Sequence, residues 1–172
     1  MEYTKSVKTP KRQGSPKIVV LGIGNLLLKD EGIGVHLVQK LAGVVDDADT
    51  KIVDAGTYPD FLSLVDDNLD KLIIVDAVKT GDKPGTIYRF SSDDLDLDST
   101  LPVSAHDMGV PNSLKSLALF HKQPKSTVVI GIEPKTIDFG LELSPEVEAK
   151  LPEVMDLVLQ EIQETTAMEV YK

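Results

Sequence analysis

The chain has 172 residues, of which 41% are hydrophobic and 27% are charged, so it can bury one sizeable core and is not a disordered chain. Cysteine is absent, which excludes disulfides, thiolate nucleophiles and cysteine-ligated metal sites and leads us to expect a cytoplasmic protein. The formal net charge of −10 argues against nucleic acid or an anionic membrane as the main partner.

The N-terminal segment differs from the rest of the chain in its charge. Residues 1–16 contain Lys5, Lys8, Lys11 and Arg12 but no apolar stretch of the kind that a secretory signal requires. No apolar run approaches the roughly 18 residues of a membrane span. We therefore expect a flexible basic tail over 1–16, a single α/β domain over 17–164, and a C-terminal tail over 165–172.

Strand and helix patterns alternate along the predicted domain. Short apolar runs indicate buried strands, and apolar residues at 3.6-residue spacing indicate helices. In chain order we expect strand 17–22, helix 32–45, strand 51–55, a short helix 58–67, strand 71–78, a turn over 80–85, strand 86–90, helix 110–121, strand 126–132 and helix 144–163. Strand 86–90 is less apolar than the others and is expected near an edge of the sheet.

Individual residues refine the predicted helices. The apolar face of the first helix extends to Val44 at helical spacing. In the last helix, Ser144 is the expected N-cap and Pro145 the first helical residue. Pro152 lies inside that helix and should kink it or divide it in two.

The alternation of strands and helices predicts an α/β fold. We expect a three-layer sandwich in which a mostly parallel, five-stranded sheet carries helices on both faces. In such sheets, ligands bind outside the carboxyl ends of the strands, where the strand order reverses. The first and third strands are the expected neighbours at that point, so their ends are the place to seek chemistry.

The first strand leads into a loop with the sequence GIGNLLLKDEGIG, residues 22–34. A dinucleotide-binding fingerprint needs a third glycine or alanine at position 27, where the chain has leucine, and Lys29 lacks the following Ser or Thr of a Walker A motif. Acidic residues are favourable at a helix start, so Asp30 and Glu31 could be simple caps. We adopt this interpretation for Asp30. Glu31 has a second interpretation, as a residue of a site at the strand ends.

Three polar residues can meet at the predicted strand ends. Asp76 closes the most apolar strand and needs a cation or a hydrogen-bond donor if it is buried. Glu31 can approach Asp76 if their strands are neighbours, and two close carboxylates need a metal or a shared proton. His106 lies in a loop ahead of a helix. One imidazole and two carboxylates suit a divalent ion such as Ni²⁺, Zn²⁺ or Fe²⁺.

Two further groups of acidic residues have plainer interpretations. Asp54 could position the loop at 56–57, but it could equally be an ordinary strand-end aspartate. The segment 91–102 contains four aspartates but lacks the glycine and the bidentate glutamate of a calcium loop, so we expect a solvated loop.

The order of the motifs resembles that of the maturation endopeptidases of nickel–iron hydrogenases, over about residues 17–163. The matching segments are VLGIGNLLLKDEGIGV at 20–35, DAGT at 54–57, LIIVDA at 72–77, PGT at 84–86, SAHDMG at 104–109, VIGIEP at 129–134 and GLELSPEV at 140–147. The resemblance implies an α/β sandwich around a twisted five-stranded sheet. It also implies that Glu31, Asp76 and His106 bind a metal and carry the catalytic function.

The resemblance further implies what the protein does. Members of the family remove a C-terminal extension from the hydrogenase large-subunit precursor after nickel has been inserted. The expected partner is therefore that precursor, and the nickel ion can belong to the substrate instead of being a resident cofactor, although other divalent metals can occupy the site. We expect a monomer that binds neither nucleic acid nor membrane. Asp107 departs from members that carry an amide there, and its carboxylate could orient His106.

The sequence leaves the mechanism and two other function classes open. We expect metal-assisted hydrolysis, because cysteine is absent and no serine triad is apparent, although one carboxylate could instead act as a general base. The protein could also be a non-catalytic chaperone that checks nickel in the large subunit. A third possibility is a small-molecule hydrolase on a similar scaffold.

Overall fold

The computed structural model describes residues 17–57, 60–91 and 109–170. In chain order its elements are β1 (Ile18–Ile23), the 3-10 helix η1 (Lys29–Gly32), α1 (Ile33–Leu41), β2 (Thr50–Gly56), α2 (Phe61–Leu64), β3 (Lys71–Ala77), β4 (Ile87–Ser91), α3 (Gly109–Leu119), β5 (Ser126–Ile132), α4 (Pro145–Glu148) and α5 (Leu151–Val170). The predicted tail 1–16 and the acidic residues 92–102 lie outside the described residues.

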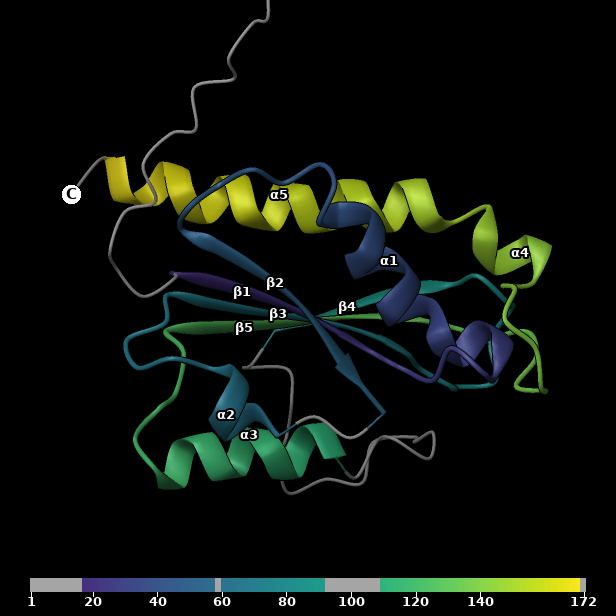
Figure 1. Ribbon diagram of the computed structural model, residues 1–172, viewed down its shortest axis with the longest axis horizontal. Coiled ribbons are helices and arrows are strands. Elements are labelled where there is room, and N and C mark those ends of the chain that lie inside the picture. Colours follow the sequence, from purple (N-terminus) through teal and green to yellow (C-terminus); the bar gives the residue numbers. More distant parts are fainter. Residues whose placement is uncertain (1–16, 58–59, 92–108, 171–172) are drawn as a thin grey trace, which may run out of the picture.

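The five strands form one sheet in the order β2-β1-β3-β5-β4. The β1–β2, β1–β3 and β3–β5 pairs are parallel, and β4 pairs with β5 in the antiparallel direction. Helices α1 and α5 cover one face of the sheet, and α2 and α3 cover the other (Figure 1). The expected three-layer α/β sandwich is confirmed, as are the edge position of β4 and the pairing of the first strand with the third.

The core is divided by the sheet into two apolar layers. Alternate residues of a strand point to opposite faces, so Val20 and Ile73 pack under α1 and α5, whereas Val19 and Leu72 pack against α2 and α3. All residues of β1 and β3 are buried, including the polar ends of β3. This pattern is typical of central parallel strands with both faces covered.

Helix α1 lies directly on the sheet because two glycines remove the side chains between them. A Cβ atom on Gly34 would lie 2.3 Å from the carbonyl oxygens of both Ile23 and Val75, and one on Gly22 would lie 2.1 Å from the Gly34 oxygen. Such distances are far below van der Waals contact, so only glycine fits at these positions. The close approach holds the start of α1, and η1 before it, against β1 and β3.

The predicted boundary of the first helix is wrong at its C-terminal end. Helix α1 ends at Leu41, and Val44, which was expected on its buried face, is 60% exposed. Gly43 follows one residue after the C-cap Ala42 and disfavours continuation of the helix. The chain then turns at Asp47, whose carboxylate accepts hydrogen bonds from Asp49 N and Thr50 Oγ1. The short helix expected at 58–67 also covers fewer residues, Phe61–Leu64.

The C-terminal helix is divided, as the position of Pro152 predicts. Helix α4 ends at Glu148, and α5 begins at Leu151, so the proline occupies the first turn of α5, where its missing N–H costs no helical hydrogen bond. The expected tail over 165–172 is wrong for its first six residues, because α5 continues to Val170. No glycine or proline occurs after Pro152 to end the helix.

Within the described part of the chain, no helix is long and apolar enough to cross a membrane.

Candidate active site

The carboxyl ends of β1 and β3 bring together two of the predicted site residues. Gly22 of β1 is in register with Val75 of β3, and η1 packs against β3. Glu31 lies in η1 and Asp76 is the penultimate residue of β3, so both carboxylates are at the same edge of the sheet. Their exposed fractions are only 5% and 3%. Burial of two carboxylates at a strand end requires partners of opposite charge or hydrogen-bond donors.

The backbone around these two residues is tightly folded. The Ala77 N–H donates to Asp76 Oδ1 at 2.8 Å, which fixes the direction of the Asp76 side chain. The Glu31 N–H donates to Leu28 O at 3.2 Å, and Glu31 O accepts from the Asn25 N–H at 3.2 Å. Gly24 has a φ of 148°, and a Cβ atom there would lie 2.0 Å from Glu31 O. The loop that carries Glu31 is therefore held by hydrogen bonds between its own backbone groups, and its conformation requires glycine at position 24.

Asp30 has a different role from the simple helix cap that the sequence predicts. Its side chain is fully buried and accepts hydrogen bonds from Lys135 N at 2.9 Å and Thr136 N at 3.0 Å. It also accepts from Ser144 N at 2.6 Å and from the Ser144 hydroxyl at 2.8 Å. Ser144 stands at the N-cap position of α4 as expected, but its hydroxyl binds Asp30 and makes no capping hydrogen bond. Asp30 thus fastens the loop 135–144 to the segment that holds Glu31.

A short backbone pairing reinforces this connection between the two segments. Leu28 and Gly140 form an isolated parallel bridge. The Gly140 N–H donates to Leu27 O at 3.0 Å, and the Lys29 N–H donates to Gly140 O at 2.9 Å. His36 of α1, which the sequence did not suggest as a site residue, places Nε2 3.2 Å from Leu141 O. The segment after Glu133 is therefore held along the outer side of the site.

A second buried carboxylate fixes the loop that follows Asp76. Glu133, directly after β5, is 3% exposed and accepts hydrogen bonds from Thr80 N and Thr80 Oγ1, both at 2.8 Å, and from Gly81 N at 3.1 Å. Burial opposes its ionisation, but these donors outweigh burial and hold the pKa of Glu133 below its ordinary value. Sequence analysis missed this role, since only the motif IEP marked the position.

Of its two interpretations from the sequence, Asp54 follows the one in which it positions the loop at 56–57. Asp54 Oδ1 accepts a hydrogen bond from the Gly56 N–H at 3.0 Å, and Gly56 has a left-handed φ of 61°. Gly56 O in turn accepts from the Gly24 N–H at 2.9 Å. Asp54 therefore supports the turn after β2, next to the loop that leads to Glu31.

The third predicted ligand, His106, and its neighbour Asp107 lie outside the described residues. Among the residues that the structure describes, no three His, Asp or Glu side chains gather closely enough to hold a metal ion. The two carboxylates that are described, Glu31 and Asp76, provide oxygen donors that suit a divalent ion. Binding of a metal by all three residues stays a prediction.

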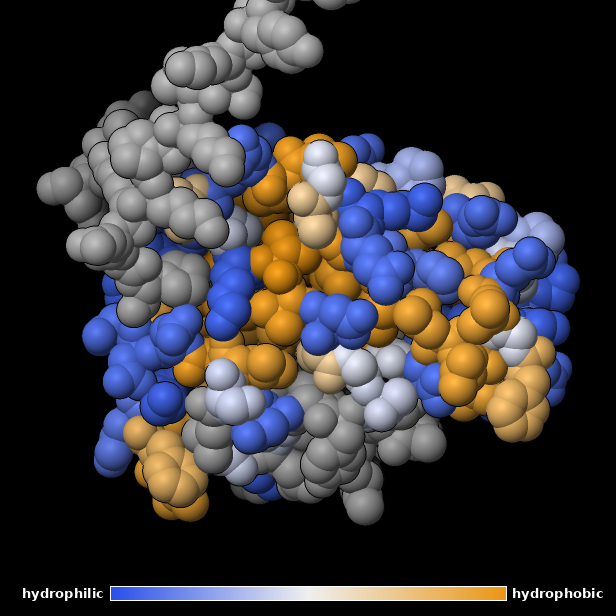
Figure 2. All heavy atoms as spheres, viewed as in Figure 1, coloured by the Kyte–Doolittle hydropathy of each residue, from blue (hydrophilic) through white to orange (hydrophobic). Residues whose placement is uncertain are grey.

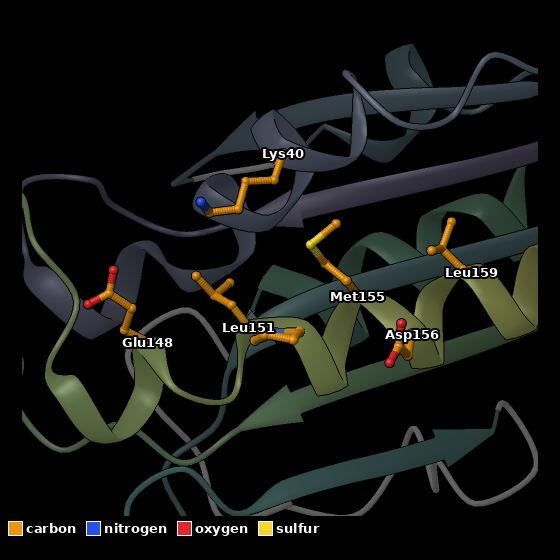
Figure 3. A pocket seen from close by; sticks show the side chains of 7 residues that line it. Lys40, Glu148, Leu151, Met155, Asp156 and Leu159 are labelled. Atoms are coloured by element: carbon orange, nitrogen blue, oxygen red, sulfur yellow. The ribbon is translucent and has the colours of Figure 1, made fainter.

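Two of the hollows on the described surface differ in their lining residues. One, of about 310 Å³, adjoins the Asp30 anchor and is lined by Lys29, Lys135, Thr136, Glu142, Leu143, Ser144 and Pro145. The other, of about 360 Å³, lies between α1 and the helices α4 and α5 and includes Lys40, Glu148 and Met155 (Figure 3). Neither hollow is lined by Glu31 or Asp76, but the first is lined by Lys135, Thr136 and Ser144, which bind Asp30 next to Glu31.

The fold and the motifs are shared with known proteins. A family model described as hydrogenase maturation protease matches residues 35–161. The chain belongs to the hydrogenase maturation protease family.

Individual relatives agree with this assignment. The hydrogenase 2 maturation protease of Escherichia coli K12 is 33% identical over 154 residues, covering 87% of this chain and 92% of the relative. The hydrogenase expression/formation protein HupD of Thiocapsa roseopersicina is 32% identical over 151 residues, covering 86% of this chain and 68% of that protein. The structure of the hydrogenase maturating endopeptidase HybD from E. coli superposes with a TM-score of 0.77 at 30% identity, covering 87% and 93% of the two chains. This hydrogenase maturation protease is therefore an endopeptidase with the five-stranded α/β fold of its relatives.

Proposed function

We propose that this protease removes the C-terminal extension of a nickel–iron hydrogenase large-subunit precursor after nickel insertion. The observation that carries the proposal is the burial of Glu31 and Asp76 at the adjoining ends of β1 and β3, in a chain that belongs to the hydrogenase maturation proteases. Strand ends at this edge are where α/β folds bind their substrates. The precursor's nickel is then part of the substrate, recognised at this edge.

The proposed site consists of Glu31, Asp76 and His106, which together would hold one divalent ion. Such an ion supplies Lewis acidity to a carbonyl or to a water molecule. The protein itself orients the two carboxylates through the Ala77 N–H and through the closed loop around Glu31. Glu133 fixes the loop after Asp76, and Asp30 fixes the loop beside Glu31. One of the two site carboxylates can also accept the proton of the attacking water as a general base.

The proposal is tested by intact-mass spectrometry of a nickel-loaded precursor and a nickel-free precursor, each incubated with the protein. We expect loss of a defined C-terminal peptide from the nickel-loaded sample alone. Cleavage of both precursors would show that the enzyme does not require nickel in its substrate, and would contradict that part of the proposal. A stable nickel-dependent complex without any cleavage would favour the non-catalytic chaperone instead.

The site residues are tested with the same precursor. Asp76→Ala and Glu31→Gln should each lower the cleavage rate more than about 100-fold, because each removes a group that contacts the reacting atoms or their ion. Asp156→Ala, at an exposed position on α5, is the matched control and should cleave at the normal rate. Circular dichroism and thermal unfolding must show that the variants are folded. Normal processing by a folded Asp76→Ala protein contradicts the assignment.

The proposal includes a monomeric enzyme that works in the cytoplasm, as the sequence leads us to expect. Sedimentation of the purified protein measures the first part, and fractionation of cells that express it measures the second. A stable dimer in solution would overturn the expected oligomeric state without changing the proposed chemistry.

A further inference from the structure

Three large apolar side chains are exposed beside the candidate site. Leu27, Phe139 and Leu141 have exposed fractions of 58%, 88% and 64%. They come from two segments that are hydrogen bonded to each other, because Gly140 donates to Leu27 O and lies between Phe139 and Leu141. Figure 2 shows apolar surface at the right-hand end of the molecule, below the position of α4 in Figure 1. We call these three residues the edge patch.

The edge patch is held in place by the same contacts that position the site. Asp30 binds the loop 135–144 through Lys135, Thr136 and Ser144, and the bridge between Leu28 and Gly140 joins that loop to the site loop. A rigid exposed apolar surface loses little conformational entropy when a partner covers it. Clustered apolar side chains of this kind mark interaction sites, whereas single exposed ones are ordinary.

We propose that the edge patch is the docking surface for the large-subunit precursor, and this inference rests on the proposed function. Continuity with the substrate site supports this occupant. Leu27 belongs to the loop that ends in Glu31, and a scissile bond that reaches the buried Glu31 and Asp76 must bring the neighbouring substrate surface over this edge. The patch would bind apolar side chains of the precursor next to the cleavage point.

Charge complementarity supports the same occupant. Lys29, two residues after Leu27 and two before Glu31, lines the 310 Å³ hollow together with the carboxylate of Glu142, in a chain whose net charge is −10. The hollow also contains Lys135, whose ammonium group pairs with Glu146 at 2.5 Å. Any C-terminal extension ends in a carboxylate, so a cation here can attract the part of the precursor that is to be removed. The surface thus places the ammonium group of Lys29 beside exposed apolar side chains, whereas Lys135 is paired with Glu146.

A matched pair of double variants tests the docking surface. Phe139→Ser with Leu141→Ser should raise KM for the precursor at least about tenfold while kcat changes less than about twofold, since uniform binding is lost. The control is Phe120→Ser with Leu119→Ser, which removes an exposed phenylalanine (61%) and an exposed leucine (76%) at the C-terminal end of α3 and directly after it. The control should leave both constants unchanged. Both proteins should unfold at the wild-type temperature, because the altered side chains are exposed.

Two results of these kinetics would overturn the inference. One is an unchanged KM in the edge-patch variant, and the other is an equal rise in KM in the control, which would show a general effect of surface apolarity. Because wild-type cleavage is measured in the same series, failure of the proposed function is seen separately as absence of cleavage by the wild type. Lys29→Gln should weaken the dependence of KM on salt concentration. An unchanged dependence would show that the charge of Lys29 does not attract the precursor.

A direct contact measurement does not depend on turnover. A photoreactive benzoylphenylalanine at position 139 should crosslink to the nickel-loaded precursor, whereas the same group at position 120 should not. Crosslinking at 139 supports docking even with a precursor that is not cleaved. Absence of a crosslink at 139, or a crosslink to a second copy of this chain instead, overturns the precursor as the occupant.

Discussion

Asp30 shows how a single buried carboxylate can organise a surface loop. Its two oxygens accept three backbone N–H groups and one hydroxyl from residues more than 100 positions further along the chain. Hydrogen bonds to a charged acceptor are stronger than neutral ones, and they are stronger still away from water. The loop 135–144 has little regular structure, so Asp30 and the bridge between Leu28 and Gly140 together fix its position beside the site.

Replacing Asp30 with alanine should therefore lower the free energy of unfolding by about 3 kcal/mol, because one buried and two partly buried N–H groups and the Ser144 hydroxyl lose their acceptor. Urea denaturation followed by circular dichroism measures the change. Asp138→Ala is the control, since Asp138 is exposed and accepts only the Thr136 hydroxyl in the described structure, and it should stay within about 0.5 kcal/mol of the wild type. Equal stability of the two variants would contradict the anchoring role.

Sequence analysis found some of these residues and missed others for a definite reason. The position of Glu31 and Asp76 at one edge of the sheet could be predicted, because one follows an apolar strand, the other lies near the end of one, and the carboxyl ends of neighbouring parallel strands meet there. Asp30 and Glu133 could not, because their partners are 105 to 114 and 52 to 53 residues away and consist largely of backbone groups. Backbone N–H groups carry no sequence signal, so an acidic residue that binds them resembles an ordinary cap.

At the scale of elements, the contact of α1 with the sheet is the feature most sensitive to substitution. Gly34→Ala would place a Cβ atom 2.3 Å from two carbonyl oxygens, so α1 must move away from β1 and β3. We expect a loss of about 3 kcal/mol in the free energy of unfolding, the upper end of overpacking effects. Cleavage should fall as well, since η1 and Glu31 move with the helix. Urea denaturation and the mass assay measure the two effects.

Gly43→Ala is the matched control for this substitution. The nearest atom to a Cβ there is Lys40 O at 3.6 Å, which is ordinary contact, and the φ of Gly43 is not positive. Alanine restricts the unfolded chain, so the variant should be unchanged or more stable by less than about 1 kcal/mol. A loss at Gly43 as large as that at Gly34 would contradict steric overlap with the sheet as the cause of the Gly34 effect.

The elements themselves were largely predictable, whereas their ends were less so. All five strands follow from apolar runs, and Pro152 correctly predicted the division between α4 and α5. The overlong prediction for α1 came from Val44, which has the right spacing but follows Gly43 and lies in a turn. The underestimate of α5 came from its last turns, where Thr165 and Thr166 interrupt the apolar stripe that runs as far as Ile162. Thr165 and Thr166 there bond back to carbonyls of the preceding turn.

At the scale of the whole molecule, one ion cluster joins the helical layer to the sheet. Glu161 of α5 pairs with Lys71 of β3 at 2.5 Å and with Arg89 of β4 at 2.6 Å. Glu161 and Lys71 are 5% and 8% exposed. Burial opposes ionisation of Glu161, but the hydrogen bonds and charges of Arg89 and Lys71 outweigh it, so the pKa of Glu161 is below its ordinary value.

This lowered pKa fixes the sign of a pH effect on stability. A carboxyl with a lower pKa in the folded protein binds fewer protons when folded than when unfolded, between the two pKa values. Its contribution is therefore fully present above the ordinary glutamate pKa and is lost as the pH falls below that value, towards the folded pKa. Glu133, whose pKa is also lowered, contributes in the same direction and adds to the acid sensitivity.

Glu161→Gln should separate the contribution of the ion cluster from that of Glu133. At pH 7 the variant should be less stable by about 3 kcal/mol, because buried Lys71 loses its carboxylate partner. The difference from the wild type should shrink as the pH falls below the ordinary glutamate pKa, since the wild type then loses the same interaction. Urea denaturation across this pH range measures it, with Glu153→Gln, from an exposed pair with Lys150, as the control. A difference that stays constant with pH would mean that the charge of Glu161 does not hold the helical layer on the sheet.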